Sequence, residues 1–435
     1  MEVPRVRVTR FLCHSAREGA AARMTRLVLT MTVLVGAAGI VGLVADSPAP
    51  AAAADSPISI AMITSLTGVG ASEFSDAPAG FDARIALQNA EGGVNGHKIV
   101  GMVLDDQTSA TEIATAVQDA LSKGVFGIVS TSPLFFLAAK YPQEQGVPVT
   151  GGSFDGPEWG TKPYTNMFAS DTGSVDPAYP VNTGIGTFLK THGGTVLCSY
   201  GYGISPSSAR SAIGTMDSFE HEGGKEGQLD TTIPFGSVAM TTPALQAKQA
   251  GCKAFYAGLD DNSNVALATS LEQEGVKPKV MVFPTGYEPS LINSPAWADV
   301  QGGYFDTDFR PFAIPDAGTL QMQAALEKYE HFTSKDFPTF SQYESWLGAD
   351  LMIKGLELAG KHPTRAAVIR DLRNLKSYNG NGLLAETINY STIFGHDLSQ
   401  ACGWYMKAEK KGFVPDSTTP TCGNDLRGTT TVQSS

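Results

Sequence analysis

Short apolar runs alternate with helical patterns of apolar and polar positions from residue 58 onward. Residues 58–65 form an apolar run typical of a buried strand. Residues 81–90 have helical spacing, paired glycines at 92–93 end that helix, and residues 98–104 predict the next strand. This succession of strand, helix, glycine stop and strand is the repeating unit of a doubly wound α/β sheet.

Two aspartates, Asp105 and Asp106, follow the strand at 98–104 directly. Ser109 and Glu112 then have the spacing of a helix capping box. Open α/β sheets bind ligands at the carboxyl ends of their strands, which is where both aspartates fall. A solvated loop that leads into a helix explains the same residues, and it is the interpretation we favour.

A second, similar series of elements begins after the polar stretch 172–182. Its predicted elements are strands at 195–200, 229–233, 254–257 and 279–283 and helices at 208–220, 242–250 and 262–274. Two such blocks in tandem indicate two α/β lobes. The helical segments at 319–329 and 342–359 cannot enclose a core by themselves, so we expect the chain to return to a lobe already built.

The N-terminal segment has the pattern of a secretory leader. Two arginines precede an apolar run at 27–45, and small residues follow at 51–54. We therefore predict a Sec-type signal peptide over 1–54, with Met24 as the more ordinary start. The run is also long enough to span a bilayer, so an uncleaved anchor is the alternative. No cysteine ends the run, and hence no lipobox is seen.

Charge narrows the classes of partner. The leader carries six arginines and three acidic residues, which leaves 25 of the 31 basic and 40 of the 43 acidic residues after position 54. The mature chain therefore has a formal net charge of −15. Such a chain is a poor ligand for phosphate backbones and anionic lipids, so we expect no nucleic-acid partner.

Four cysteines follow the leader, an even number that suits an oxidising compartment. Cys402 and Cys422 flank a short hairpin-like stretch, and we expect them to form a disulfide. Cys198 lies inside a predicted strand and Cys252 just before another, so their heights in the sheet differ by roughly 10 Å. A bridge between them would be strained, and the sequence leaves this pair open.

Six segments occur together in a characteristic order: "ISIAMITSLTG", "AEGGVNGHKIVGMVLDDQTS", "GVFGIVS", "GVPVTGG", "ALQAKQAGCKAFYAG" and "VMVFPTGYEP". In this order and spacing they resemble the type I periplasmic solute-binding proteins, in particular the leucine/isoleucine/valine-binding (branched-chain amino acid) group of ABC importers. The resemblance implies a two-lobed α/β clamp, each lobe a doubly wound, mostly parallel sheet. Three crossovers join the lobes, which close on a solute by hinge bending.

The resemblance and the element pattern together predict how the chain is divided. The expected segments are the signal peptide 1–54, lobe 1 at 55–178, lobe 2 at 179–304, a return to lobe 1 with hinge crossovers at 305–380, a return to lobe 2 at 381–414, and a loose C-terminal tail at 415–435.

The resemblance also implies ligand contacts after the third and fourth strands of lobe 1. In the family, hydroxyl and backbone N–H groups of the loop after the third strand bind the ligand carboxylate. The corresponding residues here are Ser130 and Ser132. Ser132 is explained equally well as a helix N-cap. After the fourth strand, Ser153 is expected to hydrogen-bond the ligand and Phe154 to pack on it, while Asp155 either holds an ammonium group or is a solvated loop acid.

Lobe 2 is expected to contribute contacts at its strand ends and at a crossover. These candidates are Tyr202, Leu259, Asp260, Tyr287 and Phe305. Related amino-acid binders often use a glutamate for the ligand amine, and that glutamate is not evident here. Specificity for α-amino acids therefore requires Asp155, Asp260 or Glu288 to substitute for it. Core or loop packing explains any single candidate nearly as well as ligand contact.

The function that the resemblance implies is capture of a small molecule, an amino acid or a related amide or organic acid, for delivery to ABC-importer permease subunits. It implies a monomer that works outside the cytoplasm without catalytic residues, cofactor or metal. A ligand-sensing clamp that regulates a partner is the alternative, and a secreted hydrolase is a further one. The sequence has no G-x-S-x-G elbow and no H-x-x-x-H pair, which disfavours the hydrolase.

Overall fold

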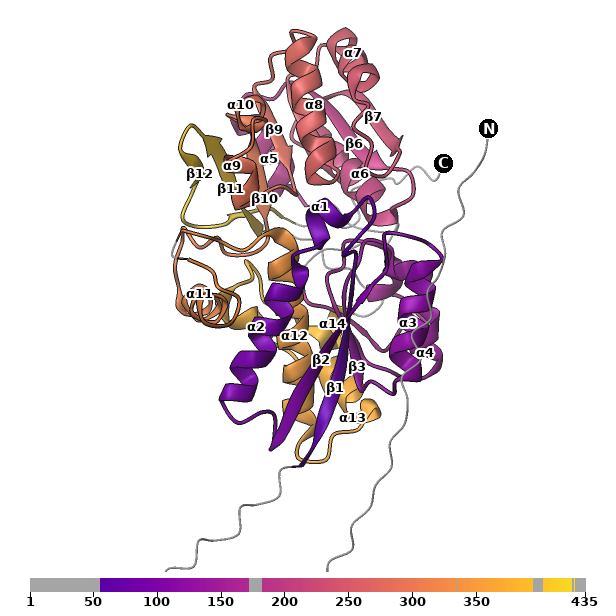
Figure 1. The fold of residues 1–435 in the computed structure, drawn as a ribbon. Coiled ribbons are helices and arrows are strands. Elements are labelled where there is room, and N and C mark those ends of the chain that lie inside the picture. The colour runs from indigo at the N-terminus through magenta and orange to yellow at the C-terminus, as the bar shows by residue number, and fades with distance from the viewer. Residues whose placement is uncertain (1–54, 172–181, 334, 394–401, 425, 427–435) are drawn as a thin grey trace, which may run out of the picture. The chain divides into compact units, whose positions relative to one another are not determined.

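A computed structural model describes residues 55–171, 182–333, 335–393, 402–424 and 426 of the chain. They form two α/β lobes, each built on one sheet (Figure 1). The predicted signal peptide 1–54 lies outside the described residues. Within the described ranges, no helix combines the length and the apolar character needed to cross a membrane.

The sheet of lobe 1 contains five parallel strands in the order β2-β1-β3-β4-β5. They are β1 (Asp55–Thr64), β2 (His97–Asp105), β3 (Gly127–Thr131), β4 (Val149–Gly151) and β5 (Met167–Ala169). Successive side chains of β1 point to opposite faces: Ile60 and Met62 belong to one core cluster, and Ala61 and Ile63 belong to another. Because both faces are covered, the strand reads as a continuous apolar run.

Helices cover both faces of this sheet. The helices of lobe 1 are α1 (Ala71–Phe74), α2 (Ala77–Ala90), α3 (Glu112–Ser122), α4 (Lys140–Glu144), α11 (Ala317–Tyr329), α12 (Phe340–Ala359), α13 (Arg365–Arg373) and α14 (Tyr390–Ile393), with short 3-10 turns η1 (Phe135–Leu137), η2 (Pro157–Trp159) and η3 (Gly380–Gly382). Figure 1 shows α2 and α12 on one side of the strands and α3 and α4 on the other.

The long helix α12 packs closely because glycines face its neighbours. A Cβ atom on Gly80 of α2 would lie 2.0 Å from the carbonyl oxygen of Gln342. A Cβ on Gly348 of α12 would lie 2.8 Å from Val129 Cγ1 in β3. The Thr150 hydroxyl donates a hydrogen bond of 2.7 Å to the carbonyl of Gly348. Residues from the C-terminal half of the chain therefore complete the core of lobe 1.

The sheet of lobe 2 repeats this strand order. Its strands are β6 (Val196–Tyr202), β7 (Lys225–Ile233), β8 (Ala254–Gly258), β9 (Val280–Phe283), β10 (Tyr304–Thr307), β11 (Cys402–Glu409), β12 (Gly412–Pro415) and β13 (Thr421–Cys422). The parallel part has the order β7-β6-β8-β9-β10, and β11, β12 and β13 add antiparallel pairs. The prediction of two α/β lobes with mostly parallel sheets is confirmed.

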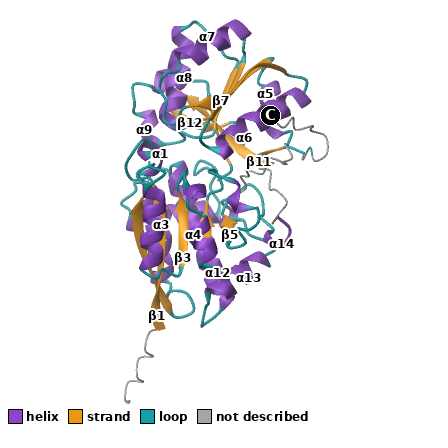
Figure 2. Ribbon diagram, turned by 90° about the vertical axis from the view of Figure 1, so that its right-hand side faces the viewer, coloured by secondary structure: helices purple, strands orange, loops and turns teal. Residues whose placement is uncertain are grey.

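Lobe 2 also has helices on both faces of its sheet. They are α5 (Gly184–Thr191), α6 (Pro206–His221), α7 (Thr241–Ala250), α8 (Asp261–Gln273), α9 (Pro289–Ile292) and α10 (Trp297–Val300). Figure 2 shows α7 and α8 on one side of the sheet and α5 and α6 on the other. Ser205 accepts a hydrogen bond from the Ser208 amide and caps α6, and Pro206 at the first helical position suits the fixed backbone there.

The chain passes between the lobes after β5, after β10 and before β11. The last passage comes later than residue 381, the predicted return to lobe 2. Leu383, Leu384 and Ile388 are buried in the core cluster of lobe 1, and Leu384 forms a bridge with Phe309. Near the C-terminus, residues 415–424 are tied to lobe 2 by β13 and by a hydrogen bond of 2.9 Å from the Asn424 amide to the Thr183 hydroxyl.

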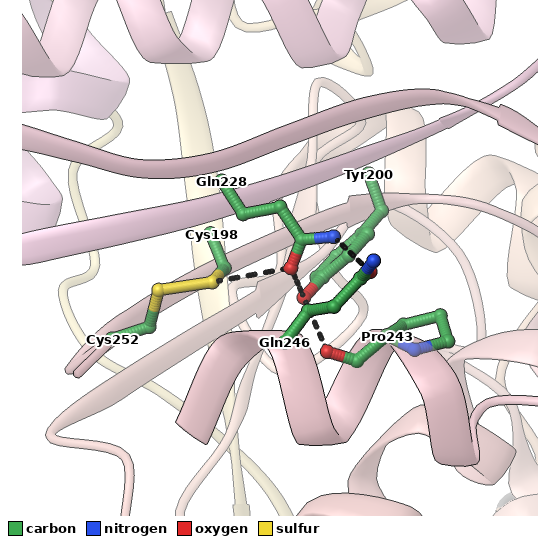
Figure 3. Close-up of a disulfide and its surroundings, with 6 residues drawn as sticks. All are labelled: Cys198, Tyr200, Gln228, Pro243, Gln246 and Cys252. Atoms are coloured by element: carbon green, nitrogen blue, oxygen red, sulfur yellow. Dashed lines mark hydrogen bonds between the residues drawn. A yellow bond between two sulfur atoms is a disulfide. The ribbon is translucent and has the colours of Figure 1, made fainter. Parts of the chain in front are cut away.

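Two disulfides join neighbouring segments of lobe 2. Cys402 and Cys422 face each other across β11 and β13, with Cα atoms 4.0 Å apart. Cys198 and Cys252 are also joined, with Cα atoms 5.8 Å apart (Figure 3). This separation is well below the expected difference in height of roughly 10 Å, so that expectation is wrong and the two cysteines lie within bridging distance. Gly227 leaves room for the bridge, since a Cβ there would lie 2.5 Å from Cys252 Sγ.

Candidate ligand-binding site

One cavity collects residues that follow strand carboxyl ends in both lobes. Its volume is about 300 Å³. Lobe 1 contributes Ser153 and Phe154 after β4 and Asp171 after β5, and lobe 2 contributes Tyr202 from the end of β6 and Asp260 after β8. Parallel strands bring their carboxyl ends to one edge of a sheet, so residues far apart in sequence meet here.

Aromatic rings form the lobe 1 wall of the cavity. Phe154 stacks on Phe74 of α1, with ring centroids 5.4 Å apart, and meets the edge of Phe340 from α12 at 5.3 Å. In lobe 2, Tyr202 packs against Phe235 at 4.7 Å. These rings give a ligand a broad apolar surface with few rotatable bonds to immobilise.

A hydrogen-bonded unit in lobe 2 holds Tyr202 and Asp260 together. The Tyr202 hydroxyl donates to Asp260 and accepts a hydrogen bond of 2.8 Å from the Asp260 amide. The other carboxylate oxygen of Asp260 caps α8 by accepting from the Ser263 amide at 2.9 Å. Burial and the nearby Asp260 carboxylate both raise the pKa of Tyr202, so the phenol keeps its proton.

A second unit fixes the loop after β4. The amide and hydroxyl of Ser153 donate hydrogen bonds of 3.1 and 2.7 Å to Asp171. Glu344 of α12 is fully buried beside Asp171, and burial, followed by repulsion from Asp171, raises its pKa well above the usual value. A protonated Glu344 can donate to Asp171, whereas two carboxylates could not share the site. A Cβ on Gly152 would lie 2.5 Å from Glu344 Oε2, so glycine permits this pairing.

The cavity is rich in carboxyl groups. Its described lining includes five acids and one guanidinium: Glu73, Asp171, Asp260, Asp306, Asp308 and Arg210. Glu73 of α1 is buried opposite acids of lobe 2, and burial, then repulsion from Asp261 and Asp260, raises its pKa well above its usual value. A lining of this kind favours ligands that donate hydrogen bonds or carry positive charge.

Five of the ten ligand contacts predicted from the sequence line the cavity. These residues are Ser153, Phe154, Tyr202, Leu259 and Asp260. The other five, Ser130, Ser132, Asp155, Tyr287 and Phe305, are buried in packing around it.

The predicted serines Ser130 and Ser132 do not line the cavity. Ser132 donates its hydroxyl hydrogen to Asp106, which also accepts a hydrogen bond of 2.5 Å from Ser65. Its neighbour Pro133 lines the cavity instead. Ser130 lies under the β4 loop, where a Cβ on Gly151 would meet its carbonyl oxygen at 2.0 Å. This arrangement also gives Asp106 a structural role: it ties three loops of lobe 1 together.

The remaining predicted residues serve local packing. Asp155 accepts hydrogen bonds from the Phe136 amide at 2.9 Å and from Trp159 Nε1 at 2.7 Å, so its carboxylate is turned into lobe 1. Tyr287 and Phe305 both pack against Phe413, with ring centroids 5.0 Å apart in each pair. Alternation along β10 sends Phe305 to the α8 side of the sheet, away from the cavity.

Sequence reasoning missed many lining residues, including Asp171, Phe235 and Phe340, and among the missed residues two groups are notable. Glu73 and Phe74 lie in a four-residue helix with no periodic pattern. The other group lies between α6 and the sheet of lobe 2 and contains Ser207, Ser208, Ser211, Gly214, Thr215, Tyr256, Asp306 and Tyr405. The spacing of small hydroxyl residues in "SPSSARSAIGT" was the available signal for the second group, because it places them on one face of a helix.

Comparisons with known proteins agree with this architecture. The family model described as "Periplasmic binding protein" matches residues 57–413. No curated protein sequence matches the chain.

Several solved structures are similar. A fatty acid ABC transporter substrate-binding protein from Thermomonospora curvata has a TM-score of 0.69 and 18% identity over 84% of this chain and 92% of that chain. The branched-chain amino acid transporter substrate-binding protein LivJ from Streptococcus pneumoniae, in complex with isoleucine, has a TM-score of 0.65 and 15% identity over 82% and 99%. An R. palustris solute-binding protein in complex with benzoate has a TM-score of 0.66 and 14% identity over 85% and 98%. At these identities the likeness shows a shared fold.

Proposed function

The chain belongs to the periplasmic binding protein family, and we propose on that basis that it captures a small solute outside the cytoplasm and delivers it to an ABC importer. The observation that carries this proposal is the cavity of about 300 Å³ lined by strand-end residues of both lobes. Cavities of this size and position suit one small molecule. The expected partners are the solute and the permease subunits, with the protein acting as a monomer.

The proposed solute is an amino acid or a related amide or organic acid with an apolar part. Phe74, Phe154 and Phe340 provide the apolar surface. The acids of the cavity wall, Glu73 and Asp260 among them, support a solute group that donates hydrogen bonds, such as an amino group or an amide. The fold relatives named above bind a fatty acid, isoleucine or benzoate, so the fold itself does not select the solute. We propose that the solute leaves chemically unchanged.

A thermal-shift screen of the chain from Asp55 tests this function. The library should contain amino acids, amides, short peptides and aromatic acids, each titrated to saturation. A solute that binds only the native state stabilises it by about 2.7 kcal/mol at a concentration one hundred times its Kd. We expect a saturable rise in Tm for one class and an unchanged solute on recovery. Conversion of the solute into product, or no saturable rise across all classes, would contradict the proposal.

A further inference from the structure

The cavity continues from the aromatic wall into lobe 2, beneath α6. We call this part the lobe 2 recess and define it by Ser211, Gly214, Thr215, Tyr256, Asp306 and Tyr405. Its walls come from three elements: α6, the strand β8, and the neighbouring strands β10 and β11. The aromatic wall at Phe74, Phe154 and Phe340 belongs to lobe 1, so the cavity has two compartments of different chemistry.

Asp306 occupies an unusual place in the sheet. Tyr304, two residues earlier on β10, points to the same face and packs in the apolar cluster of α5 and α6. Asp306 lies opposite Tyr405 of β11 in the antiparallel register. One carboxylate oxygen, Oδ1, is buried and has no hydrogen-bond partner among the described residues. An acid at a core-facing position with an unsatisfied oxygen is unfavourable unless another molecule supplies a donor.

The neighbouring hydroxyls do not supply that donor. Tyr256 and Ser211 hydrogen-bond each other, with their oxygens 2.8 Å apart. Thr215 also bonds to Tyr256. Burial raises the pKa of Tyr405 and of Tyr256, and repulsion from the nearby Asp306 carboxylate raises both further. Both phenols therefore keep their protons, and the recess presents Asp306 as its acceptor.

We propose that the lobe 2 recess receives one end of an elongated solute and that Asp306 accepts a hydrogen bond from an ammonium or hydroxyl group at that end. The apolar remainder of the solute would then lie along Phe74, Phe154 and Phe340. This inference rests on the proposed function, because it names the chemistry of the solute that the same cavity holds. It also predicts that the recess rejects a carboxylate end, since two buried carboxylates repel each other.

Three probes of equal length and different end groups test the recess: phenylbutylamine, phenylbutanol and phenylbutanoate. Calorimetric titration of the mature chain at about pH 8.5, above the Asp306 pKa of about 7, should give a Kd for the amine and the alcohol about tenfold or more below that for the carboxylate. In Asp306→Asn the three values should converge to within about threefold. Asp217→Asn is the matched control, because Asp217 is a half-buried acid of α6 that does not line the cavity; it should keep the wild-type preference.

Gly214→Leu provides a second variant that fills the recess. Leucine favours helix more than glycine, so α6 should form normally, and circular dichroism checks this. We expect all probes to bind about tenfold more weakly.

Four results would overturn the inference: equal or stronger binding of the carboxylate by the wild type, an unchanged preference in Asp306→Asn, unchanged affinities in Gly214→Leu, or no binding of any probe. The solute screen tests the proposed function separately. If a solute binds saturably and its affinity is unchanged in Asp306→Asn and Gly214→Leu, the inference about the recess is wrong but the proposed function stands.

Discussion

Tyr202 and Asp260, which are 58 positions apart, hold each other in place at the lobe 2 side of the cavity. Each acts as both donor and acceptor: the phenol donates to the carboxylate, and the Asp260 amide donates to the phenol oxygen at 2.8 Å. The Ser263 hydroxyl donates to the Asp260 carboxylate at 3.0 Å, and its oxygen lies 3.0 Å from the Tyr202 oxygen. This mutual bonding fixes a polar surface at the start of α8 before any solute arrives.

The Tyr202→Phe variant tests this unit. Removing the hydroxyl leaves the buried Asp260 amide without its partner, and the carboxylate oxygen keeps only the Ser263 hydroxyl, which together cost roughly 1–3 kcal/mol. We expect lower Tm and weaker solute binding. Tyr200→Phe is the control, because Tyr200 lies in the same strand and its hydroxyl bonds to Gln228, away from the cavity. Equal losses of solute affinity in the two variants would contradict a role for Tyr202 at the site.

Comparing variants of Ser153 and Ser132 tests which of the two buried serines contacts the solute. Both are buried serines of lobe 1 loops that donate to an aspartate, Asp171 or Asp106. Only Ser153 lines the cavity. Ser153→Ala should therefore weaken solute binding by about 1 kcal/mol, whereas Ser132→Ala should lower stability alone. Titration calorimetry and thermal unfolding of both variants measure the two effects, and a larger affinity loss in Ser132→Ala would reverse the assignment.

Glu73→Gln should change how stability depends on pH. Burial and the surrounding acids, Asp261, Asp260, Glu288 and Asp76, raise the pKa of Glu73 in the folded protein. Because the pKa of Glu73 is higher in the folded than in the unfolded protein, its contribution to the free energy of unfolding is complete below the pKa of the unfolded state. That contribution is lost as pH rises through the pKa of the folded state. The amide cannot ionise, so the variant should be more stable than wild type at pH 8 by on the order of 1 kcal/mol or more. Denaturant unfolding at pH 5 and pH 8 measures this; a larger gain at pH 5 would refute it.

Asp306→Asn should show a narrower pH window. Burial raises the pKa of Asp306 to about 7. Below about pH 4 the carboxyl is protonated in both the folded and the unfolded protein, and it does not destabilise the fold. As pH rises from about 4 to about 7, the unfolded protein ionises first, so the free energy of unfolding falls by at most about 4 kcal/mol. Asparagine removes this dependence, so the stability curves of variant and wild type should diverge between pH 4 and pH 7. Parallel curves over that range would show that Asp306 titrates as an ordinary acid.

Gly152→Ala tests the tight loop after β4. An added Cβ would lie 2.4 Å from the Phe154 ring and 2.5 Å from Glu344 Oε2. Relieving these clashes should displace the Phe154 ring. We expect the free energy of unfolding to fall by roughly 1–3 kcal/mol and the affinity for the solute to decrease. Gly160→Ala is the control, because no atom lies within 4 Å of its added Cβ. The two variants are compared by denaturant unfolding and titration; indistinguishable behaviour would contradict the packing described here.

Breaking the disulfide between Cys402 and Cys422 should destabilise lobe 2. The bridge closes a loop with a sequence separation of 20, for which loss of the cross-link costs about 3 kcal/mol. The double variant Cys402→Ser, Cys422→Ser should therefore unfold at lower denaturant concentration, while retaining β11 in the sheet. Unchanged unfolding would indicate that β13 adds nothing to stability.

Much of the fold was predictable because local patterns decide it. The apolar run around Ile60 and the glycine stop at Gly92 each act over a few residues. The same holds for part of the site. Ser153 and Asp260 follow strands directly, and the carboxyl ends of parallel strands must share an edge.

Tertiary structure alone decided which side chains face the cavity. Ser132 and Pro133 are neighbours in one loop, yet only the proline lines the cavity, because Asp106 of another loop binds the serine. Asp155 is turned into lobe 1 by Trp159. Asp306 becomes notable only when α6 and β11 enclose it. The sequence alone determined the elements, their order and the edge where they meet, since these follow from short-range periodicity. The direction of each side chain depends on partners far along the chain, and only folding brings those partners together.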